Sequence, residues 1–144
     1  YVDAQALDLV KKPWDFDVLV MENMFGDILS DLSGGLVGGM GMAASAEIGD
    51  DHCLFQPAHG SAPDIMGQDK ANPLAAILSG GLMLDWLGYK SDNETLITAT
   101  RLIDKAIEDG FAAGELRPIE FGGDMGLKEI TKAVIDNVHK AEIE

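Results

Sequence analysis

The sequence is poor in cysteine and in basic side chains. Its single cysteine, Cys53, rules out a disulfide within the chain and is typical of a reducing compartment, so we expect a cytoplasmic protein. Only 10 lysines and arginines stand against 25 aspartates and glutamates, and the formal net charge is −15. Because a surface of that sign repels nucleic-acid phosphates, we expect no nucleic-acid partner.

A long apolar run is missing as well. The longest one, residues 73–87, contains Ser79 and Asp85 and is shorter than the roughly 20 residues that a transmembrane helix needs. No signal-peptide pattern opens the chain, and we expect no membrane segment. The chain begins with Tyr1 and enters a predicted element at once, so we expect it to be part of a longer protein.

The chain does have helical periodicity along much of its length. The spacing of apolar residues predicts a helix over residues 4–12 that Pro13 stops, and another over residues 27–37. Asn93 is predicted to cap a further helix that ends at Gly110.

Two more helices and two strands complete the predicted fold. Asn72 should cap a helix that begins at Pro73 and is apolar almost all round, so this helix is predicted to be buried. Asp124 is the predicted cap of the last helix, over residues 127–138. Runs rich in β-forming residues at 16–21 and 52–56 predict strands. Helices interleaved with short strands predict an α/β fold.

Asp27 and Asp31 are the first candidate site residues. Four residues apart on a helix, their Cβ atoms lie about 5–6 Å apart, and two like charges there destabilise the helix by roughly 0.2–0.5 kcal/mol. A hard divalent cation would offset this repulsion, because Mg²⁺ and Mn²⁺ prefer carboxylate oxygens. A solvated helix face is the alternative, and the spacing alone does not decide between them.

The glycines that follow imitate a dinucleotide-binding loop. Residues 39–44 match the pattern G-x-G-x-x-A, but that loop must follow a strand and open a helix. Here a predicted helix precedes the pattern and a polar loop, residues 45–51, follows it. We therefore reject a Rossmann fold and predict that these glycines let a helix end pack closely against its neighbours.

A second informative segment is FQPAHGSAPDIMGQDKANP, residues 55–73. It has the prolines and glycines of an ordered loop entering a helix, and it carries His59, Ser61 and Asp64. Ordered loops on a rigid scaffold commonly carry binding residues. A lone histidine is more often structural, but the combination predicts a binding loop.

NMFGDILSDLSGGLVGGMGM, followed by HGSAPDI and ANP, resembles the C-terminal half of the isocitrate/isopropylmalate dehydrogenase family, and most of all its isopropylmalate branch. The resemblance implies an α/β/α sandwich that is not a Rossmann fold, and the C-terminal portion of a two-domain subunit. Residues 1–37 would belong to the dimerisation and metal-binding domain of a homodimer. Residues 38–144 would form the C-terminal part of the cofactor-binding domain.

The same resemblance implies a site. Asp3, Asp27 and Asp31 would bind Mg²⁺ or Mn²⁺, and Asp3, in YVDA, would reach the partner subunit's site as a catalytic residue. Asp64 would select NAD, because a carboxylate accepts hydrogen bonds from ribose hydroxyls and repels a 2′-phosphate. The implied cofactor-binding residues are His59, Gly60, Ser61, Ala62, Pro63, Asp64, Ile65 and Asn72.

The implied reaction is metal-dependent, NAD-linked oxidative decarboxylation of a 2-hydroxy acid, with 3-isopropylmalate of leucine biosynthesis as the first candidate substrate. Gln56 stands where most isopropylmalate enzymes have glutamate, so tartrate, malate, homoisocitrate and isocitrate are alternatives. A non-catalytic regulatory or binding subunit and a purely structural domain are the others. The family's catalytic lysine and tyrosine match nothing in this chain, so we predict that the isolated 144 residues are inactive.

Overall fold

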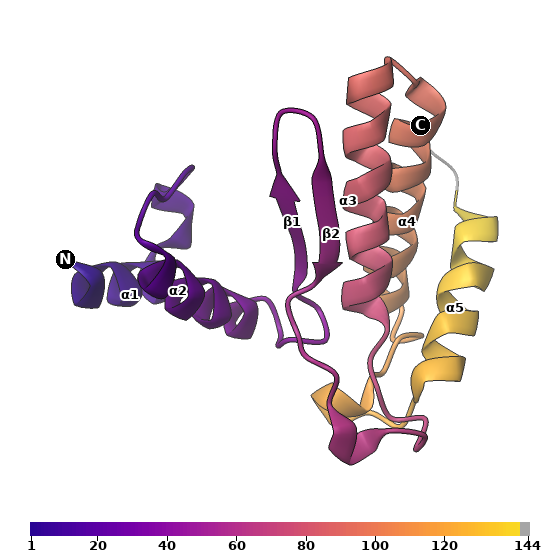
Figure 1. The fold of residues 1–144 in the computed structure, drawn as a ribbon. Helices are drawn as coiled ribbons and strands as arrows, with labels where there is room; N and C mark the ends of the chain where they lie inside the picture. Colours follow the sequence, from indigo (N-terminus) through magenta and orange to yellow (C-terminus); the bar gives the residue numbers. More distant parts are fainter. Residues whose placement is uncertain (142–144) are drawn as a thin grey trace.

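The computed structural model describes residues 1–141, in which helices predominate and two strands form one antiparallel hairpin (Figure 1). The α-helices are α1 (Val2–Lys11), α2 (Asn23–Leu36), α3 (Leu74–Ser91), α4 (Glu94–Ala112) and α5 (Leu127–Lys140). The strands are β1 (Ala44–Ile48) and β2 (Cys53–Pro57), and the short 3-10 helices are η1 (Pro13–Asp15), η2 (Pro63–Ile65) and η3 (Ile119–Phe121).

Helix α3 lies at the centre of the larger part of the molecule. The hairpin packs on one side of α3, α4 packs on another, and α5 packs against α4. Helices α1 and α2 contact each other and lie beyond the hairpin in Figure 1. No helix within residues 1–141 combines the length and hydropathy needed to cross a bilayer.

The hydrophobic core joins α3, α4 and α5. Its fully buried side chains include Leu74 at the start of α3 and Ile130 in α5, with Ile107 of α4 and Leu116 of the following loop beside them. Full burial of one such side chain stabilises the fold by about 1.5–3 kcal/mol. This cluster therefore fixes the three helices around the beginning of α3.

Glycines allow α3 and α4 to approach closely. A Cβ atom added to Gly88 would lie 2.6 Å from Ile97 Cγ1, which is too close for any side chain. Further along the same interface, the buried Thr100 hydroxyl donates a hydrogen bond of 3.0 Å to the Gly81 carbonyl. The prediction that α3 is buried all round is nevertheless wrong, because Leu82 and Met83 remain 41% and 40% exposed.

The hairpin is attached to α3 through Trp86. The Phe55 ring of β2 packs against Trp86 with a centroid separation of 6.1 Å. Lys90 Nζ lies 4.6 Å from the centre of the Trp86 ring and donates to the Asp50 carbonyl at 2.9 Å, in the turn of the hairpin. Strand β1 occupies most of the segment that was predicted to be a polar loop, so that prediction is wrong. The segment has few β-forming residues, and it forms a strand because it pairs with β2.

Two local predictions are wrong. Residues 16–21 form no strand, and Val18 and Val20 are 81% and 93% exposed, because no segment within residues 1–141 pairs with this run. Asp124 does not cap α5, because Arg117 Nε holds its carboxylate at 3.0 Å.

The predicted caps Asn72 and Asn93 are confirmed, since each side-chain oxygen accepts a backbone N–H at the start of its helix.

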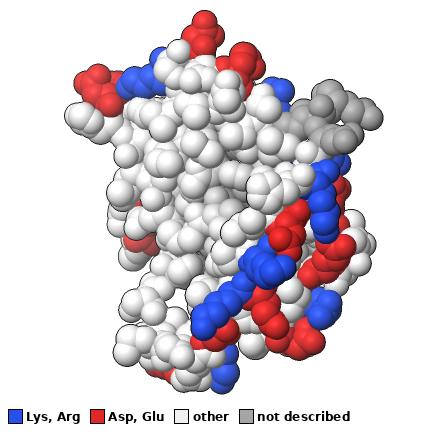
Figure 2. Space-filling view, turned by 90° about the vertical axis from the view of Figure 1, so that its right-hand side faces the viewer, with Lys and Arg blue, Asp and Glu red and all other residues white. Residues whose placement is uncertain are grey.

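The charged surface is organised along the helices. Figure 2 shows the side on which α5 lies, where acidic and basic side chains gather in a band across part of the surface. Ion pairs one helical turn apart include Lys105–Asp109 in α4, at 3.0 Å, and Lys132–Asp136 in α5, at 2.6 Å. Exposed pairs of this kind contribute only about 0–1 kcal/mol each.

Asp104 of α4 gives a testable pH dependence. Partial burial raises the pKa of its carboxyl, and the charges of Asp85 in α3 and Glu108 raise it further. The protonated form is therefore favoured in the fold, and its stabilising effect is lost as the pH rises through the folded-state pKa. We predict that Asp104→Asn raises the thermal unfolding midpoint at pH 7 in circular dichroism melts, and that the gain shrinks at acidic pH.

Asp109→Asn is the matched control, since it also neutralises one aspartate of α4 but removes the partner of Lys105. It should give no gain at pH 7. Equal behaviour of the two variants would contradict the stated effect of burial at Asp104.

Candidate functional site

A cavity of about 880 Å³ lies beside the loop that connects β2 to α3. The turn before β1, helix η3 and the first residues of α5 form its other walls. Its volume is within the range of about 300–1,000 Å³ that is typical of small-molecule sites. Six of the predicted cofactor residues line it, namely His59, Gly60, Ser61, Ala62, Ile65 and Asn72, whereas Pro63 and Asp64 lie outside the lining.

The loop between β2 and α3 is ordered by its own hydrogen bonds. The Ala58 N–H donates to the Ala43 carbonyl at 2.9 Å, which ties the end of β2 to the start of β1. Ala62 adopts a left-handed conformation with φ of 43°, and η2 follows it directly. Strained residues of this kind persist where the surrounding structure holds them, and they are common at binding sites.

His59 is oriented by the carbonyl that follows it. Its Nδ1 lies 2.8 Å from the Gly60 carbonyl oxygen. Because a carbonyl oxygen only accepts hydrogen bonds, this contact requires a proton on Nδ1, and in that tautomer Nε2 is the acceptor nitrogen of the ring. His59 thus offers the cavity an acceptor for a ligand hydroxyl or amine.

The Glu120 carboxylate joins three segments that are distant in sequence. One oxygen accepts the Gly41 N–H at 3.1 Å and the other accepts Asn72 Nδ2 at 3.0 Å. The Gly41 carbonyl in turn accepts the Ala75 N–H of α3 at 2.8 Å. A Cβ at Gly41 would collide with Glu120 and Asn72, so the predicted close packing after α2 is confirmed at this glycine.

Asp69 closes the opposite wall by capping α5. Its carbonyl accepts the Leu127 N–H at 3.2 Å and its carboxylate accepts the Lys128 N–H at 3.1 Å. The first N–H groups of a helix have no partner within the helix, so these bonds satisfy two of them. Gly126 allows the approach, because a Cβ there would collide with the Asp69 carbonyl.

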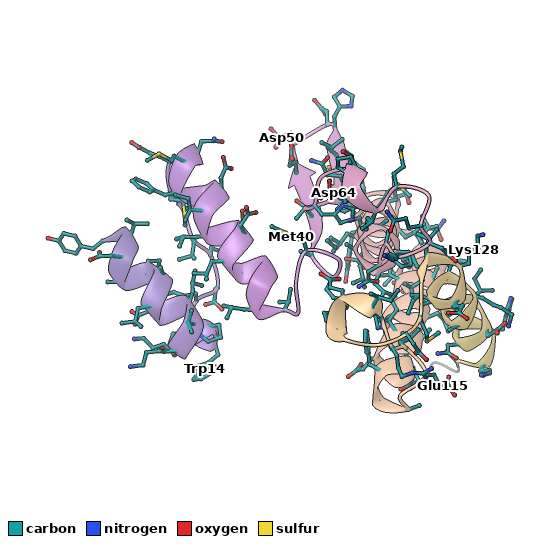
Figure 3. All side chains as sticks on the ribbon, turned by 90° about the horizontal axis from the view of Figure 1, so that it is seen from below. Trp14, Met40, Asp50, Asp64, Glu115 and Lys128 are labelled. Atoms are coloured by element: carbon teal, nitrogen blue, oxygen red, sulfur yellow. The ribbon has the colours of Figure 1, made fainter. Side chains whose placement is uncertain are left out.

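Sequence reasoning missed both Asp69 and Glu120. Their partners are far along the chain: Asp69 and Lys128 differ by 59 in residue number, and Gly41 and Glu120 by 79. Aspartate is a good helix cap, but nothing in its neighbourhood indicates which helix it caps. Asp64 and Lys128, labelled in Figure 3, come from the two segments that Asp69 joins.

The acidic pair of α2 is placed as the spacing predicted, within one helix and exposed to solvent. The Asp27 carboxylate accepts a hydrogen bond from Asn23 Nδ2 at 3.1 Å. Within residues 1–141 no three histidine, cysteine, aspartate or glutamate side chains form a metal site, so Asp3 of α1 does not join Asp27 and Asp31 within one chain. Two exposed carboxylates fit an open Mg²⁺ site, which takes few protein ligands and fills its shell with other oxygens.

Comparison with known proteins decides the family. The model of the isocitrate/isopropylmalate dehydrogenase family matches residues 1–138. The chain belongs to this family. The family resemblance inferred from the motifs is therefore confirmed.

Relatives with different substrates in their names match the chain about equally well. The isocitrate/homoisocitrate dehydrogenase of Thermus thermophilus is 47% identical, covering 94% of this chain and 38% of the relative. The 3-isopropylmalate/3-methylmalate dehydrogenase of Methanocaldococcus jannaschii is 45% identical, covering 97% and 40%. The chain thus spans about two fifths of the length of these curated relatives.

The predicted fold class is also confirmed. The crystal structure of isocitrate dehydrogenase from Methylococcus capsulatus matches with a TM-score of 0.83 and 40% sequence identity. The match covers 95% of this chain and 39% of that chain. The family fold, and the rejection of a Rossmann fold, follow from this agreement.

Replacing Asp69 tests the cap on α5. We predict that Asp69→Gly destabilises the chain by about 0.5–1.5 kcal/mol relative to a glycine substitution at a comparable position without a cap, which is the net contribution of one hydrogen bond such as that from Lys128 N–H. Glycine tolerates the positive φ of 56° at this position, so the change adds no backbone strain, and its other backbone effects are shared with a glycine substitution at a second position of positive φ. The measurement is urea unfolding followed by circular dichroism.

Asp92→Gly is the matched control. Asp92 also has a positive φ, 52°, but it ends α3, and its side chain has no hydrogen-bond partner within the described residues. It should leave stability unchanged or slightly raised. A loss equal to that of Asp69→Gly would show that the cap contributes nothing.

Proposed function

We propose that this chain is part of a metal-dependent, NAD-linked dehydrogenase that oxidises a 2-hydroxy acid and removes its β-carboxylate. The observation that carries the proposal is the cavity, where six residues of the HGSAPDI and ANP motifs come together in a member of the family. The activity belongs to the whole protein, because the chain spans only 38% of its Thermus thermophilus relative.

The cavity residues suit the adenosine part of NAD. Ile65 offers an apolar contact for a base, His59 offers a hydrogen-bond acceptor, and Glu120 fixes the amide of Asn72. Asp64 stays the proposed residue for choosing NAD, since its carboxylate would repel a 2′-phosphate. Pro63 precedes Asp64 in η2, and its carbonyl accepts the Met66 N–H that closes this short helix.

The proposed metal ligands are Asp27 and Asp31 of one subunit with Asp3 of another, and the proposed cation is Mg²⁺ or Mn²⁺. The exposure of the α2 pair supports this, because a solvent-facing pair can receive a substrate and a ligand from a second chain. Such a cation supplies Lewis-acid polarisation of the substrate's oxygen atoms when it is bound. Asp3 remains the proposed catalytic residue at that shared site.

A homodimer is the proposed assembly. The first 37 residues form the proposed dimerisation and metal-binding domain, and residues 38–144 the proposed cofactor-binding part. Large apolar side chains of α1 and α2 are exposed, and an unusual number of them on one part of a protein marks an interaction surface. They are Leu7, Val10, Met24, Ile28 and Leu36.

The proposed substrate is 3-isopropylmalate, with isocitrate and homoisocitrate as the alternatives that the names of the relatives support. Gln56 donates a hydrogen bond to Glu47 at 3.2 Å across the hairpin, so a carboxylate remains near this position in β1. The single Cys53 supports the cytoplasm as the proposed compartment.

Asp27→Asn tests the metal site. In the complete gene product we expect Mn²⁺ affinity, followed by electron paramagnetic resonance, to fall by at least about tenfold, because loss of even a supporting ligand group costs about that much. NAD reduction with the three candidate acids should fall with it. Asp8→Asn is the control, because Asp8 pairs with Lys12 at 3.6 Å on α1 and should change neither measurement.

Unchanged Mn²⁺ affinity in Asp27→Asn would refute the proposed ligand set. A wild-type protein that binds Mn²⁺ and NAD but reduces no NAD with any of the three acids would favour a non-catalytic subunit.

A further inference from the structure

The sulfur atoms at the cavity come from methionine. The chain has seven methionines and a single cysteine, and Cys53 does not line the cavity. Met40 and Met66 do line it, together with three other large apolar side chains, those of Ile65, Ile119 and Leu127. A ligand held here therefore meets an apolar surface to which two thioether side chains contribute.

The two methionines differ in their exposure to solvent. Met66 is 82% exposed, the largest value among the methionines of residues 1–141. Met40, labelled in Figure 3, lies where the chain passes from α2 to β1 and is partly buried. A Cβ atom added to Gly34 of α2 would lie 3.5 Å from Met40 Sδ. An oxidant dissolved in the solvent therefore reaches Met66 before Met40.

The backbone holds Met66 beside the cavity. Met66 ends η2, and its N–H donates to the Pro63 carbonyl at 3.2 Å. Gln68 Nε2 donates to the Asp64 carbonyl at 2.7 Å and ties the residues on either side of Met66 together. The side chain thus stays at the cavity although most of it faces solvent, and a chemical change in it alters the cavity wall.

We propose that Met66 is a peroxide-sensitive switch, whose oxidation to the sulfoxide weakens ligand binding in the cavity. In this step the O–O bond of hydrogen peroxide breaks and an S–O bond forms; the sulfur loses two electrons and the peroxide is reduced to water. A thiol-dependent sulfoxide reductase reverses the step, releasing the oxygen as water while two thiols become a disulfide. The sulfoxide is polar, so covering it with a ligand costs free energy unless it keeps a hydrogen-bond partner.

The test uses the complete gene product and takes NAD as the ligand, so it rests on the proposed function. The protein is treated with hydrogen peroxide, its oxidised methionines are located by peptide mass spectrometry, and the Kd for NAD is measured by calorimetric titration. We expect Met66 to be oxidised before the other methionines of residues 1–141, with a rise in Kd of about fivefold or more. Sulfoxide reductases with dithiothreitol should restore the affinity, and dithiothreitol alone should not. An unchanged circular dichroism spectrum checks that the treated protein stays folded.

Three variants separate Met66 from the other oxidisable residues. Met66→Leu lacks the thioether, so its Kd should be the same before and after peroxide. Met83→Leu is the matched control, because Met83 of α3 is 40% exposed but does not line the cavity. It should lose affinity on treatment as the wild type does. Met66→Gln puts a polar side chain of similar length at the cavity, and it should bind NAD more weakly than Met66→Leu without any peroxide.

The outcomes separate the switch from the proposed function. A treated wild type that carries the Met66 sulfoxide and binds NAD as tightly as before would overturn the switch and leave the proposed function intact. Equal losses of affinity in treated Met66→Leu and treated wild type would do the same. A wild-type protein that binds no NAD before treatment would overturn both.

Discussion

The Glu120 carboxylate is the interaction on which the cavity depends. It holds the turn at Gly41 and the amide of Asn72 at once, so it fixes both the end of the α2–β1 connection and the start of α3. Asp69 does the same on the other wall by binding the start of α5. Each carboxylate receives two hydrogen bonds or supplies a helix cap, and buried core residues such as Leu74 and Ile130 hold α3 and α5, at whose starts these bonds are made.

The fold was predictable from the sequence where local chemistry decides it. Periodicity located the helices, and Asn72 and Asn93 were recognisable as caps because the N–H groups that they accept are two residues away. The run at residues 16–21 shows where local sequence stops being sufficient. Its apolar residues favour a buried strand, but a strand also requires a pairing partner, which residues 1–141 do not supply.

The candidate site was predictable only in part, for the same reason. The loop with His59, Ser61 and Asn72 was recognisable from its motif, and the structure places these residues on one cavity. The residues that shape the cavity from outside the motif, Asp69 and Glu120, act across long sequence separations and have no local signature. Their roles became visible only with the packing of η3 and α5.

The order of the walls along the chain has a consequence for synthesis. The motif loop leaves the ribosome before Glu120 and Lys128, which follow it along the chain. Contacts between distant segments form only when the later segment is present, because the chain between them must first be closed into a loop. A nascent chain that has reached the end of α4 therefore displays the HGSAPDI loop without a closed cavity, and the cavity is complete only once η3 and α5 have folded.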